Sequence, residues 1–178
     1  MSLENLLTGF LEEGEGEKLL GIGVSLPGIL DETGERLLYS HALNIYDVET
    51  KQFSQHLPYP CIFMNDANAA GFAELWKNPE AENLIYLSLS NTVGGAIING
   101  GRLYTGNNLR AGEFGHVTLV PNGRKCYCGK VGCLDAYLSA KVLASYTDGN
   151  LAQFFERLRD QDQQVQATWT EYLQYLAV

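Results

Sequence analysis

One histidine and three of the chain's four cysteines lie in one short segment, residues 115–135, whose sequence is GHVTLVPNGRKCYCGKVGCLD. With nine, one and four residues between them, these are His116, Cys126, Cys128 and Cys133. One imidazole and three thiolates complete a tetrahedral shell for Zn²⁺, and four protein ligands leave no position for a reactive water. The segment therefore predicts a structural zinc site.

Disulfides or unrelated buried thiols are the alternatives to this metal site. A bridge between Cys126 and Cys128 would be strained because one residue separates them, and a reducing cytosol disfavours any bridge. Gly129 and Gly132 allow the backbone to turn and aim the sulfurs inward. Cys61 stands apart in an apolar run, where a buried small hydrophobe is the expected role.

Polar side chains at two other points are candidates for hydrogen bonds to a ligand. Asn65 and Asp66 directly follow the apolar run PCIFM (60–64), and Glu113 precedes the histidine of the metal set. Ligands in open α/β sheets bind outside the carboxyl ends of strands, and an ionised carboxylate only accepts hydrogen bonds. The alternatives are an N-cap role for Asp66 and a solvated loop carboxylate for Glu113.

The composition describes an acidic chain with enough apolar residues for a core. It has 178 residues, 46% of them hydrophobic, and a formal net charge of −9, which suggests one domain or parts of two. This charge disfavours broad binding to a phosphate backbone. No run of about 20 apolar residues and no signal peptide are present, so we expect a cytoplasmic protein with no membrane contact. Residues 1–3 resemble a cloning leader.

Several segments read as strands. Residues 18–25 and 60–64 predict buried strands, the second suited to parallel pairing, with a break at Pro27-Gly28 and a turn at DETG. Residues 83–105 predict two or three antiparallel strands, because the turn signal NGGR follows two runs of strand formers.

Other segments read as helices. Residues 47–57 predict a short helix capped by Asp47, and residues 67–77 a helix that ends at Asn78-Pro79. Three more helical stretches follow at 133–144, 150–159 and 162–176. The apolar face of the second consists of Leu151, Phe154, Phe155 and Leu158. This mixture predicts an α/β protein with one mixed sheet.

The segment EFGHVTLVPNGRKCYCGKVGCLDAYLS closely resembles the signature of the ROK family of repressors, open reading frames and sugar kinases, in which E-x-G-H precedes C-x-C-G-x-x-G-C-x-E. MNDANAAGFAE resembles the family's N-D-A-N-A-A segment, and GVSLPGILD resembles its sugar-side loop. The similarity runs in consistent order from residue 21 to residue 143. It implies part of an actin-like ATPase (ribonuclease H-like) sugar-kinase fold, with a mixed sheet and flanking helices. Residues 1–178 would then be a partial ROK domain with its zinc-binding loop at 113–135.

The resemblance also implies roles for individual residues. Zinc would be bound by His116, Cys126, Cys128 and Cys133. The sugar would be bound by Gly28, Asn65, Asp66, Glu113, His116 and Asp135. One nitrogen of His116 would bind the metal while the other reaches a hydroxyl. Asp66 would act as general base only if the protein is a kinase. Asp135 is one methylene shorter than the glutamate of the family pattern, so a water bridges to the sugar or the sugar differs.

The phosphate-binding segments of the family's kinases are altered or absent. Their Gly-rich turn, commonly G-T-G-I-G, reads SNTVG here (90–94), and the side chains of Ser90 and Thr92 would crowd a phosphate. The D-x-G-x-T segment and the glycine-rich adenosine segment do not occur in the chain. ATP and Mg²⁺ are therefore expected as cofactors only if the full-length protein is a kinase.

These observations favour a sugar-binding effector domain of a ROK transcriptional regulator, holding one structural zinc. We expect a monosaccharide ligand, a homodimer, and DNA contact only through a separate domain. The first alternative is a fragment of an ATP-dependent sugar kinase such as a glucokinase or an N-acetylhexosamine kinase. The second is a non-catalytic, zinc-stabilised interaction module.

Overall fold

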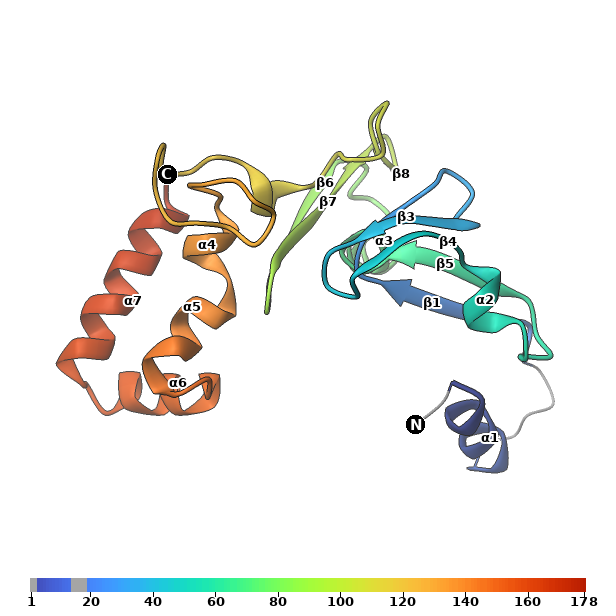
Figure 1. The fold of residues 1–178 in the computed structure, drawn as a ribbon, viewed down its shortest axis with the longest axis horizontal. Coiled ribbons are helices and arrows are strands. Elements are labelled where there is room, and N and C mark those ends of the chain that lie inside the picture. The colour runs from blue at the N-terminus through green and yellow to red at the C-terminus, as the bar shows by residue number, and fades with distance from the viewer. Residues whose placement is uncertain (1–2, 14–18) are drawn as a thin grey trace. The chain divides into compact units, whose positions relative to one another are not determined.

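The computed structural model describes residues 3–13 and 19–178, which form two compact units (Figure 1). The first unit extends to Ala69 and includes Gly106–Arg110; the second comprises Ala70–Thr105 and Ala111–Val178. Helix α3 (Asp66–Lys77) begins in the first unit and continues in the second. None of the helices in the described part of the chain is both long and apolar enough to cross a bilayer.

The first unit is built on a parallel pair of strands. Its elements are α1 (Leu3–Glu13), β1 (Ile22–Leu26), β2 (Ile29–Leu30), β3 (Arg36–Ser40), β4 (Ile45–Glu49), α2 (Lys51–Ser54) and β5 (Cys61–Asn65). Strand β1 pairs in parallel with β5, and Val24 lies opposite Phe63. Both predicted strands are confirmed, although β1 begins later than expected and residue 18 lies outside the described residues. A small core of Leu30, Leu37 and Phe63 supports this pair.

An antiparallel sheet of β2, β3 and β4 was not predicted from the sequence. The predicted helix cap at Asp47 is wrong, because Asp47 lies in β4 with a positive φ of 54°. Its carboxylate accepts a hydrogen bond from Arg36 Nε across the strands at 2.5 Å, which lowers the pKa of Asp47. The helix α2 that follows is shorter than predicted and begins after Thr50, whose hydroxyl donates to the carbonyl oxygen of Gly34 at 2.8 Å.

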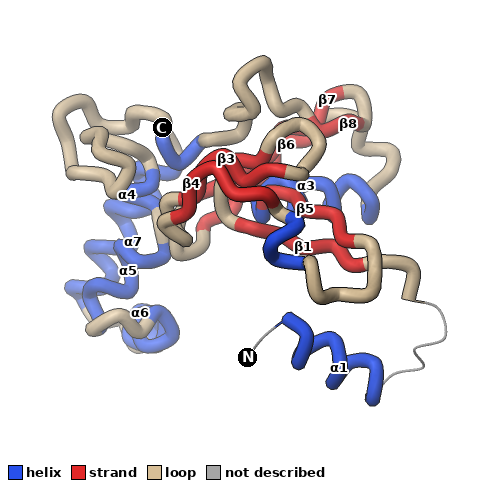
Figure 2. The backbone as a smooth tube through the Cα atoms, turned by 45° about the vertical axis from the view of Figure 1, so that its right-hand side comes forward, coloured by secondary structure: helices blue, strands red, loops and turns tan. Residues whose placement is uncertain are grey.

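The second unit begins with a three-stranded antiparallel sheet in the order β6-β7-β8. These strands are β6 (Leu84–Leu89), β7 (Val93–Asn99) and β8 (Arg102–Leu103). Gly100 and Gly101 form the β7–β8 turn with φ of 58° and 70°, the signs that a type I′ hairpin turn requires. The predicted hairpins are confirmed. In place of the one mixed sheet expected, the described residues form three small sheets, one parallel and two antiparallel (Figure 2).

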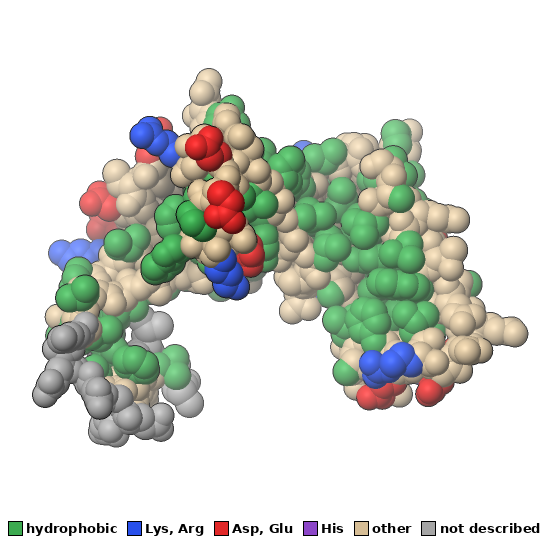
Figure 3. All heavy atoms as spheres, turned by 180° about the vertical axis from the view of Figure 1, so that it is seen from behind, with side chains coloured by type: hydrophobic (Ala, Val, Ile, Leu, Met, Phe, Trp, Pro, Cys, Tyr) green, Lys and Arg blue, Asp and Glu red, His purple; other side chains and the backbone are tan. Residues whose placement is uncertain are grey.

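The core of the second unit lies among its C-terminal helices. They are α4 (Asp135–Leu138), α5 (Ala140–Ala144), α6 (Leu151–Arg159) and α7 (Gln163–Leu176). Phe154 is fully buried and the rest of the predicted apolar face of α6 packs around it, so that prediction is confirmed. The stretch predicted at 133–144 is interrupted at Ser139, where the backbone is extended. Hydrophobic side chains also reach the surface of the molecule, as Figure 3 shows from behind.

Candidate functional site

The histidine and three cysteines of the predicted metal set converge in the second unit. One ligand atom from each of His116, Cys126, Cys128 and Cys133 lies within 4.8 Å of the others. The Sγ atoms of Cys128 and Cys133 are 3.7 Å apart, and His116 Nδ1 lies 3.9 Å from Cys126 Sγ. In a tetrahedral shell with Zn–S bonds of about 2.3 Å, sulfur atoms are about 3.8 Å apart. The four residues therefore have the donors and the spacing to hold a zinc ion.

Tight turns bring these donors together. The amide of Cys126 donates to the carbonyl oxygen of Lys130 at 2.9 Å, and the amide of Gly129 donates back to Cys126 at 3.1 Å. Gly132 has a φ of 79°, and a Cβ there would lie 1.9 Å from the carbonyl oxygen of Val120. A side chain at this position would therefore push the loop apart next to Cys133.

Burial favours the protonated form of two of the three thiols. Burial raises the pKa of Cys126 to about 12 and also raises the pKa of Cys133, which is fully buried. Ionised thiolates crowded at this spacing need a positive charge among them, and a bound metal cation deprotonates the thiols that ligate it. The types and spacing of these donors thus fit the binding of one divalent cation better than they fit four side chains with unrelated roles.

The two ring nitrogens of His116 face different groups. His116 lies in the short turn η2 (Phe114–His116), where Gly115 is pressed so closely on β7 that a Cβ would lie 2.2 Å from the carbonyl oxygen of Val93. While Nδ1 faces the thiols, Nε2 lies 4.0 Å from Glu113 Oε2. This is the division that the sequence predicted for a metal-binding and a ligand-facing nitrogen; the sugar contact itself stays a prediction.

Tyr127 is a residue of this cluster that the sequence analysis missed. Its hydroxyl lies 3.5 Å from His116 Nε2. Tyr127 is half-buried, and this partial desolvation, followed by the negative charges of Asp135 and Glu113, raises its pKa above the ordinary value. The signal in the sequence was its place between two metal-ligand cysteines, which fixes the backbone on both sides.

Asp135 is buried, with 5% of its surface exposed. Its Oδ2 accepts a hydrogen bond from the amide of Val93 at 2.6 Å, and burial raises the pKa of the carboxyl group. Because Val93 is the first residue of β7, this bond ties the zinc-binding loop to the sheet. The sugar contact of Asp135 stays a prediction. Within the fold, its carboxylate already accepts the hydrogen bond from the amide of Val93.

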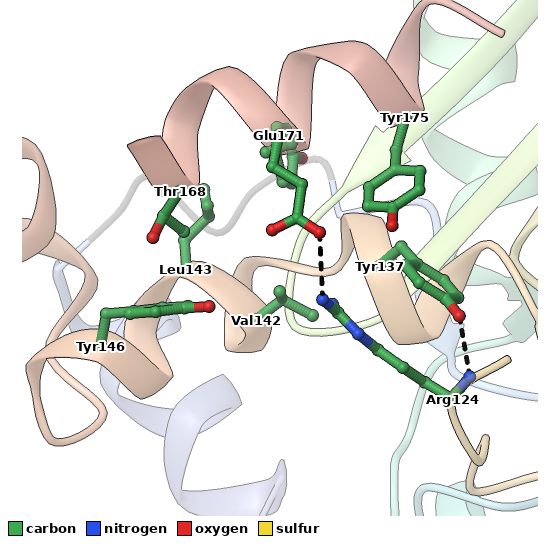
Figure 4. A pocket seen from close by; sticks show the side chains of 9 residues that line it. Arg124, Tyr137, Val142, Leu143, Tyr146, Thr168, Glu171 and Tyr175 are labelled. Atoms are coloured by element: carbon green, nitrogen blue, oxygen red, sulfur yellow. Dashed lines mark hydrogen bonds and ion pairs between the residues drawn. The ribbon is translucent and has the colours of Figure 1, made fainter. Parts of the chain in front are cut away.

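Arg124 anchors the loop to the last helix. Its backbone amide donates to the hydroxyl of Tyr137 at 2.8 Å, and its Nη2 pairs with Glu171 Oε1 on α7 at 3.5 Å (Figure 4). These residues line a pocket with Tyr175, but its volume of about 10 Å³ suits about one water molecule. A sugar does not fit there. The residues that line this pocket therefore connect the loop to α7 and do not form a ligand site.

The remaining predicted sugar-binding residues lie together in the first unit. Asn65 accepts a hydrogen bond from the amide of Asn68 at 2.9 Å and donates through Nδ2 to the carbonyl oxygen of Gly28 at 3.0 Å. Asn65 therefore caps α3, a role that the sequence analysis considered for Asp66. The exposed carboxylate of Asp66 begins the helix and accepts a hydrogen bond from the amide of Ala67 at 2.9 Å.

The fold requires a glycine at position 28. It adopts a φ of 137°, and a Cβ there would lie 2.5 Å from the carbonyl oxygen of Tyr39. The close backbone approach predicted at this glycine is therefore made to strand β3, and its approach to a ligand stays a prediction.

The loop Ser90 to Thr92 joins β6 to β7. The amide and the hydroxyl of Ser90 both donate to the carbonyl oxygen of Thr92 at 3.3 Å, and the amide of Ala140 donates to Ser90 at 2.7 Å. The loop thus closes on itself and is tied to the start of α5.

Comparison with known proteins places these features in a family. The model of the ROK family matches residues 2–178. The chain is 40% identical over 133 residues to a glucokinase from Halalkalibacterium halodurans, with 71% of this chain and 39% of that protein covered. It is 35% identical over 128 residues to the xylose repressor of Bacillus spizizenii, with 70% of this chain and 33% of that protein covered.

A similar fold is found among solved structures. A ROK family glucokinase from Streptomyces griseus, crystallised with glucose and AMPPNP, superposes with a TM-score of 0.75 at 25% identity. That comparison covers 98% of this chain and 65% of the glucokinase. The chain therefore spans less than two thirds of the length of these relatives.

We predict one zinc ion per chain, bound tightly enough to survive purification without added metal. Cys128→Ser should lose the zinc and several kcal/mol of unfolding free energy, because metal binding is coupled to folding. Cys61→Ser, in strand β5, is the matched control and should keep both. Elemental analysis and urea unfolding measure the two quantities. Sub-stoichiometric zinc with unchanged stability in Cys128→Ser would refute the prediction.

We also predict that Asp135 stabilises the second unit through its bond to Val93. Asp135→Ala should lower the unfolding free energy by about 1–3 kcal/mol, because it leaves a buried amide without an acceptor. Asp135→Asn keeps an oxygen acceptor and should lose less. Urea unfolding of the three proteins is the test, and equal stability of all three would show that the bond contributes nothing.

Proposed function

Since the chain belongs to the ROK family, we propose that it binds a monosaccharide and forms the effector-binding part of a transcriptional regulator, with a structural zinc. The observation that carries the proposal is the placement of Glu113 beside His116 Nε2, on the nitrogen that does not face the thiols. One metal-held imidazole and one carboxylate then present polar atoms to the same side.

This pair has the chemistry that neighbouring sugar hydroxyls need. A carboxylate accepts hydrogen bonds, while the free nitrogen of a metal-bound imidazole is a donor held in one tautomer. In the first unit, Asn65 and Asp66 carry an amide and an exposed carboxylate of the same hydrogen-bonding kind. Asn65 keeps capacity for a ligand, since each amide atom can make a second hydrogen bond. Each pair is proposed as a set of sugar contacts within its own unit.

The regulator is favoured over a kinase by the loop that joins β6 to β7. Phosphoryl transfer depends almost entirely on positioned phosphate, metal and donors. At the position of the Gly-rich turn this chain carries Ser90-Asn91-Thr92, and its hydrogen bonds close the loop on itself. DNA contact is assigned to a separate domain, and association as a homodimer remains a prediction.

The second candidate is part of an ATP-dependent sugar kinase. It is favoured by the 40% identity to a glucokinase, which exceeds the 35% identity to a xylose repressor. Asp66 would then take the proton of the sugar hydroxyl as a general base. In either candidate, the sugar would be held by the same residues.

We predict weak to moderate monosaccharide binding. Calorimetry against glucose, xylose, N-acetylglucosamine and N-acetylmannosamine should detect at least one ligand. Asp66→Ala and Glu113→Ala should each weaken its binding about tenfold or more, because each removes a charged hydrogen-bond acceptor. Glu80→Ala, at an exposed glutamate outside the proposed site, is the control. Binding that is unchanged in both site variants would place the sugar elsewhere.

We predict that the 178-residue chain does not phosphorylate the sugar that it binds. A general base alone contributes about 10²–10⁴-fold, far less than a kinase needs. An assay that couples ADP release to each sugar should give the same rate for the parent chain and for Asp66→Asn. Sugar-dependent turnover above that variant would make the kinase the leading candidate.

A further inference from the structure

We propose that Tyr127 is a further sugar-contacting residue, which selects among sugars through its hydroxyl and one face of its ring. The inference rests on the proposed function and adds a residue that the family pattern leaves unspecified, the x of C-x-C. It follows from the position of the phenol in the second unit beside Glu113 and His116.

The backbone of Tyr127 is held from both sides. It stands between Cys126 and Cys128, two members of the metal cluster, and the amide of Cys126 is bonded to the carbonyl oxygen of Lys130 at 2.9 Å. A residue fixed on both sides in this way projects its side chain in one direction. The metal cluster that would hold the imidazole of His116 would therefore hold the tyrosine as well.

The phenol points to the ligand-facing nitrogen of the histidine. Tyr127 Oη lies 3.5 Å from His116 Nε2, and the two rings meet edge to face with centroids 5.4 Å apart at 70°. The same Nε2 lies 4.0 Å from Glu113 Oε2. Three polar groups thus surround one position, and a hydroxyl bound to His116 and Glu113 would lie next to the phenol oxygen.

The chemistry of a phenol suits this position. A tyrosine hydroxyl both donates and accepts, whereas the carboxylate beside it only accepts. The side chain combines an apolar ring with this polar group, and 52% of the residue remains exposed. Binding sites for small molecules commonly combine aromatic walls with a few placed polar groups. The hydroxyl would therefore read one sugar hydroxyl, while the ring covers an adjacent C–H face.

The test is calorimetry on the 178-residue chain with glucose, xylose and N-acetylmannosamine, followed by singly deoxygenated analogues of the tightest ligand. Tyr127→Phe should weaken binding of that ligand about 3- to 10-fold through the loss of one hydrogen bond. Tyr127→Ala should weaken it further because the ring is also lost. Tyr146→Phe, at a partly exposed tyrosine in the C-terminal helical region, is the matched control and should bind like the parent.

The analogues distinguish a direct contact from an indirect one. For one analogue, which lacks the hydroxyl that Tyr127 contacts, the parent and Tyr127→Phe should bind equally well. An equal loss for every analogue would mean that Tyr127 acts only through His116, and would overturn the contact. Unchanged binding in both Tyr127 variants, with binding lost in Glu113→Ala, would overturn this inference alone. A parent chain that binds none of the sugars would overturn the proposed function, and this inference with it.

Discussion

The convergence of three thiols and one imidazole within 4.8 Å determines the shape of the loop that carries most of the candidate site. Between η2 and α4 the described chain forms only isolated bridges, which pair Thr118 with Cys133 and Lys125 with Val131. Backbone hydrogen bonds within the loop, such as those from Cys126 to Lys130 and from Gly132 to Arg124, set its turns, and these turns bring the four donors together. A metal ion fits these donor types, and it would offset the burial that is the largest cause of the raised pKa of Cys126, about 12.

Fixing this loop fixes three side chains with different tasks. One ring nitrogen of His116 faces the thiols, and its other nitrogen faces the carboxylate of Glu113. Tyr127 lies beside that second nitrogen, and Asp135 holds the start of β7. A structural metal would therefore bear on ligand binding without taking part in any reaction. By ordering the loop beforehand, the metal would remove the entropy cost of ordering that loop when a sugar binds.

The sequence predicted most of the regular elements and named four candidate metal ligands that converge in the structure, because apolar runs and ligand spacing are local signals. It failed where the partner is distant in sequence. Asp47 has the chemistry of a helix cap, but it pairs with Arg36 on a neighbouring strand of a sheet whose short strands carry little pattern. The cap of α3 is Asn65 rather than Asp66, a choice that depends on where the helix begins. The signal for Tyr127 was its place between two cysteines of the metal set, and only the folded loop brings its hydroxyl to the histidine.

The central claim is a closed zinc shell that holds the ligand-facing histidine. The most direct measurement is the X-ray absorption spectrum at the zinc edge of the chain purified without added metal. The account predicts three sulfur ligands at about 2.3 Å and one nitrogen at about 2.0–2.1 Å. A spectrum with fewer sulfur ligands, with a water in place of the imidazole, or with no zinc signal would contradict it.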